Sequence, residues 1–442
     1  MTTPPHEQLA RLRRGAVEII SEDALLEKLE ERRPLRVKLG LDPTAPDIHI
    51  GNAIVLQKLR QFQDLGHEAI LVIGDFTGLI GDPSGKSETR PALSPEEIQQ
   101  NAKTYRDQYS LILDPARTRV VFNSEWLRPM TFYDVIKLAS RATVHRLLER
   151  DDFEKRFREH LPIHLHELLY PLCQAYDSVA IQADVELGGT DQKFNNLMGR
   201  ELQREVGQAP QVVVLTPLLP GLDGVQKMSK SLGNAIGITE PANAMYGKVM
   251  SLADHLMIPY FEYCTLVPLE EIRVIEAALR NNTLHPRDAK QRLARAITAR
   301  YHGEAAAQAA EEEFARVFRG RELPEEIPEV TLSRAQLQKT GKLVGTDAVR
   351  LEHLLVELGA RVPDFPKSNS EARRLRDQDG VRIDDLPISA HLGPGNPGAV
   401  EARGNVVFVH LPDDAARTAV GPASGRRIQV GRRRFVRVWL DA

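Results

Sequence analysis

Short apolar segments alternate with helix-like segments through the first half of the chain, and this alternation restricts the fold more than any other feature. The apolar segments are rich in Val, Ile and Leu, and the longer segments between them repeat their apolar residues at helical spacing. We expect strands at 35–39, 69–73, 119–122, 179–181 and 212–215, and helices that include 52–65, 95–111 and 131–148. Such alternation is typical of an α/β, Rossmann-like fold with a parallel sheet and helices on both faces. Ligands then bind at the carboxyl ends of the strands.

The length of 442 residues predicts several domains and not a single core. The pattern is helical almost throughout from about 241 to 319, a Pro- and Glu-rich boundary follows, and short helices and strands make up the rest. The predicted order is a helical lead-in at 1–34, the Rossmann-like domain at 35–239, a helical domain at 240–330, a linker at 331–347 and a small α+β module at 348–442.

The composition restricts the possible partners and the compartment. A formal net charge of -3 argues against a generally basic, nucleic-acid-coating protein, so any RNA contact must come from local patches, and we expect no DNA partner. Cys173 and Cys264 are far apart and offer neither a disulfide framework nor a repeated metal-ligand spacing. No stretch approaches the ~20 apolar residues of a membrane span, and the N-terminus lacks a secretory signal. We expect a soluble protein of the reducing cytoplasm.

The segment 40–52 has the pattern of a strand end, a turn and a helix start. Backbone amides at a helix N-terminus attract anions, and Gly51 would let a ligand approach the backbone closely. A phosphate is the expected guest, and an ordinary strand-to-helix loop is the alternative. The glycine-rich segment 74–90 follows the second strand but lacks the spacing of a P-loop or a dinucleotide fingerprint, so it is either a ligand-binding loop or a plain surface loop.

One predicted helix, within 161–179, presents a phenol, an amide and a carboxylate on one face. Tyr170, Gln174 and Asp177 are spaced i, i+4 and i+7. A polar, solvated helix face is the alternative. His164 and His166 on the same segment are two residues apart and point away from each other on a helix, which argues against a metal site.

Two further polar segments lie after later strands. The segment 188–192 places two glycines before a helix N-cap, which either leaves the backbone open to a ligand or simply starts the helix. The segment 222–234 is polar and flanked by glycine, and its Lys227 and Lys230 are either functional or, as is common for surface lysines, solvated.

Arginines cluster in the last module. They lie on the predicted helix at 369–378 and near the C-terminus with no acidic residue between them: Arg373, Arg374, Arg376, Arg426, Arg427, Arg432, Arg433 and Arg434. Such clustering favours a phosphate-backbone partner, and a solvated strand face is the alternative.

Residues 49–52 and 227–231 together resemble the signature pair of class I aminoacyl-tRNA synthetases, the second motif at every position. Further motifs stand in the expected order at 40–44, 78–85, 174–177 and 188–192. On these residues the chain is similar to the bacterial tyrosyl-tRNA synthetase family over nearly its full length. The basic tail resembles a small RNA-binding module first seen in a ribosomal small-subunit protein, which in this family follows a helical anticodon-recognition domain.

The resemblance implies an enzyme that joins L-tyrosine to ATP, giving tyrosyl-adenylate and pyrophosphate, and then transfers tyrosine to the 3′-terminal adenosine of tRNA(Tyr). The attacking carboxylate is already an anion, so the protein has mainly to position two negatively charged reactants and stabilise charge on the phosphates. Magnesium arrives with ATP, and we expect no protein metal cage. Homodimerisation is implied by the family.

The resemblance also implies roles for individual residues. Those holding the phosphates are Thr44, His49 and Asn52, and those closing over the pyrophosphate are Lys86, Arg90, Lys227 and Lys230. Asp177 accepts the phenol proton of tyrosine, and Asp82, Tyr170 and Gln174 hold its ammonium group. Asp191 and Gln192 face the ribose and substrate side. The remaining ATP contacts are Gly40, Asp42, Gly51, Gly188, Gly189, Met228 and Ser229.

Three positions depart from the family pattern. Lys38, counted here among the tyrosine contacts, stands where many members have a tyrosine that touches the substrate phenol, and Glu186 stands where an amide is often found. Asn52 replaces the usual second histidine, and a neutral amide can donate to a phosphate but carries no proton charge. Segment 387–398 is an apparent extra loop in the tail.

Three other functions compete with this interpretation. A tryptophanyl-tRNA synthetase shares the scaffold, but the set of Tyr170, Gln174 and Asp177 favours a phenol. A nucleotidyltransferase that makes a small adenylate without RNA would not explain the helical domain or the basic tail. An RNA-binding paralogue without aminoacylation is disfavoured because no motif is visibly broken.

Overall fold

The computed structural model describes residues 3–43, 47–82, 95–316, 327–362, 365–384, 386–391, 399–403, 406–412, 426–431 and 434–441. The chain divides into two compact units, Met1–Gly320 and Arg321–Ala442. Each unit is described by itself.

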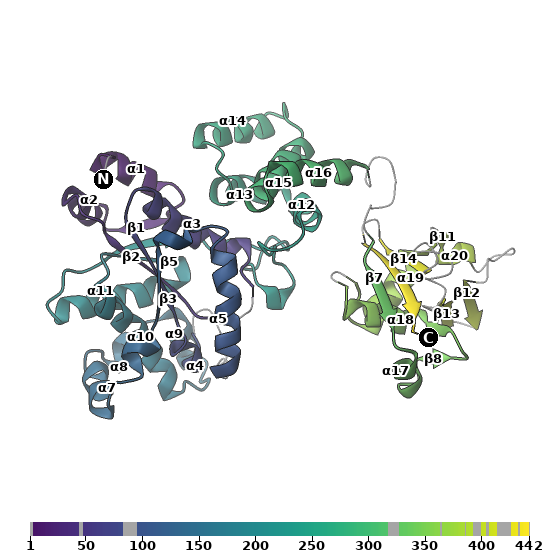
Figure 1. The fold of residues 1–442 in the computed structure, drawn as a ribbon, viewed down its shortest axis with the longest axis horizontal. Helices are drawn as coiled ribbons and strands as arrows, with labels where there is room; N and C mark the ends of the chain where they lie inside the picture. The colour runs from purple at the N-terminus through teal and green to yellow at the C-terminus, as the bar shows by residue number, and fades with distance from the viewer. Residues whose placement is uncertain are drawn as a thin grey trace. The chain divides into compact units, whose positions relative to one another are not determined.

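A six-stranded sheet forms the centre of the first unit, in the order β1-β6-β5-β2-β3-β4 (Figure 1). Its strands are β1 (Glu18–Ile20), β2 (Arg36–Leu41), β3 (Glu68–Ile73), β4 (Thr118–Phe122), β5 (Val185–Gly189) and β6 (Val212–Thr216). All neighbours pair in parallel except β1, which runs antiparallel to β6 at the edge. The α/β fold with a parallel sheet is therefore confirmed, with one antiparallel edge strand added.

Helices cover both faces of this sheet. They are α3 (Ile50–Asp64), α4 (Thr77–Ile80), α5 (Pro95–Tyr109), α6 (Ser124–Leu127), α7 (Phe132–Ala139), α8 (Val144–Leu148), α9 (Asp151–Arg158), α10 (Leu165–Ile181) and α11 (Lys193–Glu205). Successive strand residues point to opposite faces. Val37 and Leu39 of β2 belong to the large core that contains α3, whereas Lys38 between them bonds to α10. The sheet therefore buries the charged side chain of Lys38 on the face that α10 covers.

Two expectations about elements within the sheet domain are wrong. Residues 179–181, expected as a strand, form the last turn of α10, because Ile181 continues the buried face of that helix. Gln182 then adopts a left-handed conformation and ends the helix, and the strand follows as β5. The helix expected at 131–148 is two helices, α7 and α8, whose N-caps are Thr131 and Thr143. The second cap begins a new helix and so interrupts the expected one.

The N-terminal lead-in contains a strand besides its helices. Helix α1 (Pro5–Arg13) and helix α2 (Glu22–Glu30) flank β1, which is only three residues long. Residues Glu18, Ile19 and Ile20 pair with β6 in the order Leu215, Val214 and Val213. The lead-in therefore completes the edge of the sheet and does not merely precede it.

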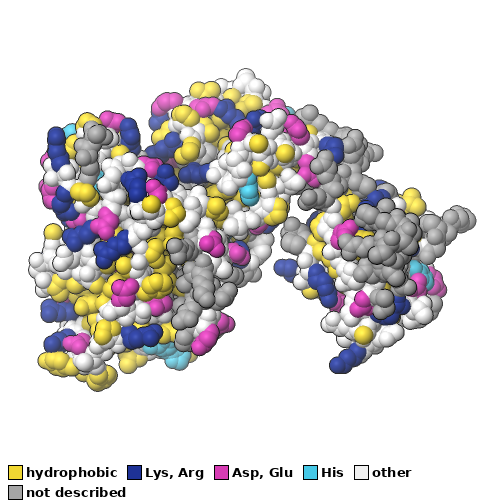
Figure 2. Space-filling view, viewed as in Figure 1, with side chains coloured by type: hydrophobic (Ala, Val, Ile, Leu, Met, Phe, Trp, Pro, Cys, Tyr) yellow, Lys and Arg dark blue, Asp and Glu magenta, His cyan; other side chains and the backbone are white. Residues whose placement is uncertain are grey.

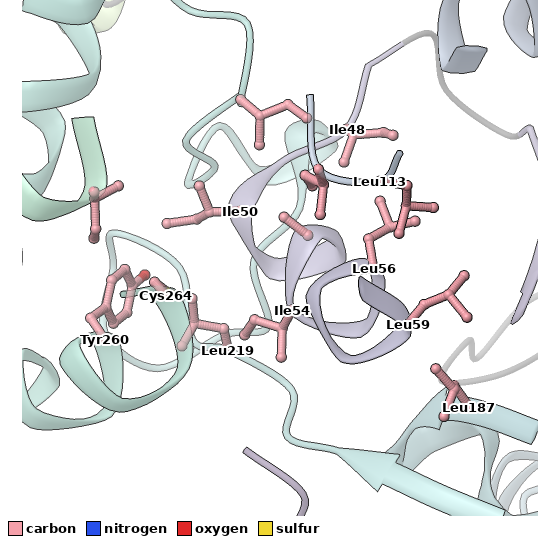
Figure 3. Close-up of a cluster of buried hydrophobic side chains, with 14 of the residues drawn as sticks. Ile48, Ile50, Ile54, Leu56, Leu59, Leu113, Leu187, Leu219, Tyr260 and Cys264 are labelled. Atoms are coloured by element: carbon pink, nitrogen blue, oxygen red, sulfur yellow. The ribbon is translucent and has the colours of Figure 1, made fainter. Parts of the chain in front are cut away.

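The helical part of the first unit comprises α12 (Ala242–Met250), α13 (Met257–Cys264), α14 (Leu269–Arg280), α15 (Pro286–His302) and α16 (Glu304–Ala315). Its helix α13 packs on α3, where Tyr260 and Cys264 lie beside Ile54 and Leu219 (Figure 3). The helical part thus shares one apolar core with the sheet layer. Among the described residues, no helix has both the length and the apolar character needed to cross a membrane.

The second unit is a small α+β structure with two sheets, in the orders β11-β10-β14-β15-β7 and β12-β13-β9-β8. Its strands are β7 (Glu329–Leu332), β8 (Leu343–Val344), β9 (Ala348–Arg350), β10 (Val381–Ile383), β11 (Leu386–Pro387), β12 (Val400–Arg403), β13 (Val406–His410), β14 (Arg426–Val430) and β15 (Arg434–Leu440). Its helices are α17 (Arg334–Lys339), α18 (Leu351–Gly359), α19 (Asn369–Asp377) and α20 (Ile388–His391).

The linker expected at 331–347 is folded structure instead. β7 pairs in parallel with β15, and α17 and β8 follow it. Leu332 and Leu337 are buried in the core of the second unit, which gives this segment a reason to fold. Part of the extra loop expected at 387–398 lies outside the described residues.

Candidate active site

The carboxyl ends of the central strands meet at one edge of the sheet and leave space there. Gly40, near the end of the central strand β2, is exposed, and a Cβ atom added to it would meet no atom within 4 Å. Strands β2, β3 and β5 run in parallel, so the residues that follow them, Asp42, Gly74 and Asp191, converge on the same edge. The predicted location of the ligand site is thus an open region lined by polar residues.

The N-terminus of α3 forms one corner of this region. His49 is its N-cap, and the imidazole Nδ1 accepts a hydrogen bond from the backbone N–H of Asn52 at 3.2 Å. A Cβ atom on Gly51 would lie 3.1 Å from that Nδ1 and 3.4 Å from Met228, so glycine lets the imidazole lie close to the helix start. Burial, reinforced by Lys227 and Lys230, lowers the pKa of His49 to about 4. The imidazole is therefore neutral at ordinary pH, and the exposed Asn52 amide stands beside it.

The lysine segment packs against the start of α3. His49 forms a β-bridge with Gly237, and Ile50 N–H donates to Ile236 at 2.9 Å. Met228 is buried in the large core and fixes the middle of the motif, whereas the lysines on either side are exposed. The structure thus brings the two sequence motifs together, although they lie far apart in the chain.

Each of the two lysines is held by a carboxylate. The ammonium of Lys227 bonds to Asp191, which follows β5, and that of Lys230 bonds to Asp47, just before α3. The backbone N–H of Ser229 donates to Asn234 Oδ1 at 2.7 Å. The cations expected to act on phosphate are therefore paired with acidic groups around the α3 N-terminus.

Asp177 lies at the bottom of the site and is only 3% exposed. The indole Nε1–H of Trp126 donates to its Oδ1 at 2.8 Å, and the Nδ2 of Asn123 lies 3.4 Å from its Oδ2. Burial raises the pKa of Asp177 to about 6, against the opposing effect of Lys38 and these donors. Asp177 is thus a desolvated carboxylate held in one orientation by neutral donors.

Asp42 and Tyr170 form the next layer. The phenol of Tyr170 donates to Asp42 Oδ2 and the hydroxyl of Thr77 donates to Asp42 Oδ1, both at 2.8 Å. A Cβ atom on Gly74 would lie 1.8 Å from Asp42 Oδ1, so the carboxylate fits directly over a glycine backbone. Burial and then the neighbouring Asp82 carboxylate raise the pKa of Asp42 to about 7. The two hydroxyl partners of Asp42 are therefore both neutral.

A chain of amides connects the remaining predicted residues. Gln192 Nε2 donates to Asp82 Oδ2 at 2.9 Å, and Arg150 lies 3.3 Å from Asp82 Oδ1. Asn195 Nδ2 donates to Gln192 Oε1 at 2.9 Å and to Gln174 Oε1 at 3.0 Å. The structure thus brings Gln174, Gln192 and Asp82 together through a continuous set of hydrogen bonds.

Gly188 and Gly189 form the floor next to these amides. A Cβ atom on Gly188 would lie 2.6 Å from Asn196 Nδ2, and one on Gly189 would lie 2.6 Å from Asp191 Oδ1. Side chains at either position would push the polar groups away from the site. The two glycines therefore let these polar side chains lie close to the backbone, besides preceding a helix.

Lys38 is close to the site but differs from its expected role. Its side chain is fully buried and ion-paired with Glu186 at 2.8 Å. The ammonium also donates to Gln174 O at 3.0 Å and to Ser178 Oγ at 2.8 Å. All three N–H donors thus have protein partners, so contact with a substrate phenol would require one of these bonds to break.

Several site residues were missed in the sequence. Asn123 and Trp126 were identifiable, because Asn123 directly follows strand β4, at the edge where ligands of a parallel sheet bind. Asp47 lies inside the segment 40–52, but its partner Lys230 is 183 residues away. Arg150 and Asn195 belong to no recognised motif, and Asp82 and Gln174, to which they bond, are 68 and 21 residues away. Thr44, Lys86 and Arg90 lie outside the described residues.

The second unit distributes its predicted RNA-binding arginines unequally. Arg373 and Arg374 are exposed on α19. Arg376 is turned inward and pairs with Glu352 and Asp377, and Arg426 pairs with Asp384. The two half-buried residues Arg427 and Arg434 lie on β14 and β15. Arg432 and Arg433 lie outside the described residues.

The fold and the site together define an α/β enzyme of the class I synthetase type, with a helix N-terminus and two exposed lysines beside the carboxyl ends of the parallel strands. The family model for tRNA synthetases class I (W and Y) matches residues 30–319. The chain is 53% identical over 435 residues to the tyrosine–tRNA ligase of Moorella thermoacetica, covering 98% of this chain and 95% of that one. It is 48% identical over 434 residues to that of Thermotoga maritima, covering 98% of each.

Solved structures resemble about 70% of the chain. The tyrosyl-tRNA synthetase of Archaeoglobus fulgidus, crystallised with L-tyrosine, matches with a TM-score of 0.58 and 25% identity, over 70% of this chain and 99% of that one. The enzyme of Aeropyrum pernix matches in fold with a TM-score of 0.55 at 22% identity, over 70% and 98% of the two chains. The chain belongs to the class I tRNA synthetases of the tryptophan and tyrosine group and, within it, to the tyrosine–tRNA ligase family.

Proposed function

We propose that this aminoacyl-tRNA synthetase activates L-tyrosine with ATP, releasing pyrophosphate, and then transfers tyrosine to the 3′-terminal adenosine of tRNA(Tyr). The observation that carries the choice of tyrosine is Asp177, a buried carboxylate with Trp126 and Asn123 as neighbours. A substrate phenol can donate to it, whereas phenylalanine would leave it without that donor. Tyrosyl-tRNA synthetases are known to reject phenylalanine in this way, because its binding leaves buried polar groups of the site unpaired.

The ammonium group of the substrate suits the layer around Asp42, Asp82 and Tyr170. Asp42 is bonded to two neutral hydroxyls, and burial together with repulsion from Asp82 raises its pKa to about 7. An arriving ammonium would add positive charge beside Asp42 and favour its ionised form. Gln174 and Gln192 complete this layer as amides already oriented by Asn195.

The α-phosphate and the departing pyrophosphate suit the α3 corner. The positive end of the α3 helix dipole and neutral donors from His49 and Asn52 would stabilise charge that develops on phosphate oxygens. Lys227 and Lys230 would exchange Asp191 and Asp47 for the pyrophosphate when ATP enters. By family resemblance, Thr44, Lys86 and Arg90 add further contacts.

The remaining ATP contacts are proposed from their positions. Gly40, Gly51, Gly188 and Gly189 allow the nucleotide to approach the backbone, and Asp191, once released by Lys227, faces the ribose side. Met228 and Ser229 position the lysines and do not carry charge themselves. Magnesium enters as part of the ATP substrate.

The proposed RNA partner is tRNA(Tyr), bound by the helical part of the first unit and by the second unit. Arg373 and Arg374 are exposed on α19 and suit phosphate contacts, whereas Arg376 and Arg426 are engaged in ion pairs within the protein. We therefore expect the first two to contribute most to the salt dependence of tRNA binding. The proposed location is the cytoplasm.

A homodimer is proposed from an exposed apolar surface on α7–α10. Figure 2 shows hydrophobic side chains gathered at the end of the first unit where α7 lies. The residues concerned are Phe132, Tyr133, Ile136, Val144, Phe157, Leu161 and Leu165. A contiguous surface of this kind marks a protein interface, and a second copy of the chain would cover it.

ATP–pyrophosphate exchange with each amino acid in turn tests the proposal, followed by charging of tRNA. Exchange with tyrosine and not with phenylalanine or tryptophan is expected. Exchange with tryptophan alone would favour the related synthetase. No exchange with any amino acid, together with tRNA binding, would indicate an RNA-binding paralogue.

A further inference from the structure

Lys38 and Glu186 form a buried ion pair across the two central strands of the sheet. They are register partners on β2 and β5, and their charged atoms are 2.8 Å apart. Their side chains are 0% and 1% exposed. Burying two charges is costly unless the pair is fully hydrogen-bonded, so a pair in this place needs a reason.

Hydrogen bonds fix both charged groups in position. The Lys38 ammonium donates to Gln174 O and Ser178 Oγ in addition to Glu186. The Ser178 hydroxyl donates onward to Glu186 Oε2 at 3.1 Å, and Gln211 Nε2 donates to the same oxygen. The ammonium is therefore held by three protein acceptors and faces α10.

The two α10 acceptors of Lys38 bracket Asp177. Gln174 lies three residues before Asp177 and Ser178 directly follows it, so the Lys38 ammonium is fastened to the turn that carries Asp177. Three other titratable groups interact with Asp177: Glu186 from β5, Asp42 after β2 and Cys173 on α10 itself. Asn123 and Trp126, which follow β4, are neutral donors to it. Among these groups Lys38 is the cation.

The electrostatics agree with this geometry. Burial raises the pKa of Asp177, Lys38 opposes that effect, and Glu186 adds a smaller contribution in the same direction as burial. Without the ammonium, the carboxyl would bind a proton more readily. A protonated Asp177 would donate a proton of its own where the phenol must donate.

We propose that Lys38 is a positioning residue for tyrosine selection: clamped by Glu186, it fixes the turn of α10 that carries Asp177 and keeps that carboxyl ionised, without touching the substrate phenol. The inference rests on the proposed tyrosine activation. It replaces the direct contact that the sequence suggested for this position.

A direct contact and an electrostatic role predict different pH dependence. Loss of a contact to the phenol would weaken tyrosine binding at every pH. Loss of the ammonium's field would weaken it only where Asp177 becomes protonated, so raising the pH would restore binding. The tyrosine KM measured against pH therefore separates the two roles.

The double variant Lys38→Met with Glu186→Gln is the main test, because it removes both charges and leaves neither one buried alone. Glutamine can still bond to Ser178 and Gln211. In ATP–pyrophosphate exchange, the tyrosine KM should rise about fivefold near pH ~6, as a one-unit rise of the Asp177 pKa from about 6 requires, and should return close to the parent value near pH ~9. The ATP KM should not change.

The single variant Glu186→Gln supplies a test of sign. It removes the anion and keeps the cation, so the tyrosine KM should lose its rise at low pH, moving opposite to the double variant. Two results would overturn the proposal. One is a pH-independent rise in tyrosine KM with acceptance of phenylalanine, which would mean direct contact; the other is an unchanged pH profile in both variants.

Lys28→Met is the matched control. Lys28 is a buried lysine 3.8 Å from Asp184, at the opposite edge of the sheet. Its removal should leave the pH dependence of the tyrosine KM unchanged, and an equal shift would overturn the proposal, since any lost lysine would then suffice. Absence of tyrosine-dependent exchange in the parent enzyme would instead refute the proposed function, so the two failures are distinguishable.

Discussion

Buried carboxylates have pKa shifts in opposite directions at the amino ends of the parallel strands, here the amino edge of the sheet, and at their carboxyl ends, the carboxyl edge. At the amino edge, burial alone would raise the pKa of Asp184, but two bonds from Arg33 at 2.7 Å and one from the backbone N–H of Arg36 hold it below its usual value. At the carboxyl edge, burial raises the pKa of Asp42 to about 7 and that of Asp177 to about 6.

The difference lies in where the positive charge comes from. The protein supplies the cation for Asp184 from its own chain, so that carboxylate can only stabilise the fold. Asp42 and Asp177 are held mainly by neutral donors from Thr77, Tyr170 and Trp126. A substrate group that donates a hydrogen bond or carries positive charge can bind beside these two carboxylates, in addition to the effect of Lys38 on Asp177, and their desolvation destabilises the fold until then.

Asp177→Ala should give the largest effect at the carboxyl edge. Removing a buried, charged acceptor is expected to cost about 1.5–3 kcal/mol of tyrosine binding, or roughly ten- to hundredfold in kcat/KM for tyrosine. Discrimination against phenylalanine should fall with it, while ATP binding persists. Pyrophosphate exchange with both amino acids is the measurement. A variant that keeps normal tyrosine exchange and still rejects phenylalanine would remove Asp177 from the pocket.

Asp42→Asn and Asp184→Asn should have opposite consequences, which tests the comparison directly. A carboxyl whose pKa is raised in the fold loses stability as pH rises from its usual value to about 7, so Asp42→Asn should raise the thermal midpoint at pH ~7.5 while slowing tyrosine activation. Asp184→Asn should lower the midpoint, because the lost charged hydrogen bonds reduce the free energy of unfolding by roughly 1–3 kcal/mol. It should leave the tyrosine KM near the parent value.

Thermal unfolding and exchange kinetics on the same two preparations provide the measurement. The comparison fails if Asp42→Asn destabilises the protein more than Asp184→Asn does, or if Asp184→Asn alone abolishes tyrosine activation.

His67 should give a smaller, pH-dependent effect at the amino edge. Its Nδ1 accepts from Leu35 N–H at 3.2 Å, its Nε2 lies 2.9 Å from Gln8 Oε1, and burial lowers its pKa to about 4. The unfolded chain therefore binds the proton first, and stability is lost as pH falls from about 6.5 towards 4. The expected loss is about 2 kcal/mol by pH ~5.

His67→Gln should remove much of that pH dependence, and urea unfolding at pH ~7.5 and ~5 measures it. An equal loss of stability in the parent and in His67→Gln between those pH values would show that other groups carry the acid sensitivity.

Asn52→Ala should give the smallest effect, about fivefold on the rate of adenylate formation, because one neutral donor to a phosphate contributes roughly 1 kcal/mol. The amide is exposed next to His49 and is expected to act chiefly on charge that develops in the reaction. Single-turnover kinetics against ATP concentration separates rate from binding. A larger change in ATP affinity than in rate would place Asn52 in ground-state binding only.

The sequence predicted the elements that local patterns encode. The alternation of strands and helices predicted the parallel sheet, and the spacing of Tyr170, Gln174 and Asp177 placed these three side chains on one face of α10. Patterns shorter than one turn were less informative. The three-residue strand β1 exists because it pairs with β6, and residues 179–181 could be assigned to a strand because a short apolar run fits either structure.

The tertiary structure decided which side chains share the site and what charge they carry. Lys230 meets Asp47 across 183 residues, and Lys227 meets Asp191. Lys38, expected to touch the substrate, is instead engaged by Glu186 and α10.

By itself, then, the sequence determined the periodicity of the elements and the motifs that name the family, because these depend on residues near one another in the chain. Only the tertiary structure decided burial, pairing and the pKa values of Asp42 and Asp177, because desolvation and charge act through space between strands and helices that are distant in sequence.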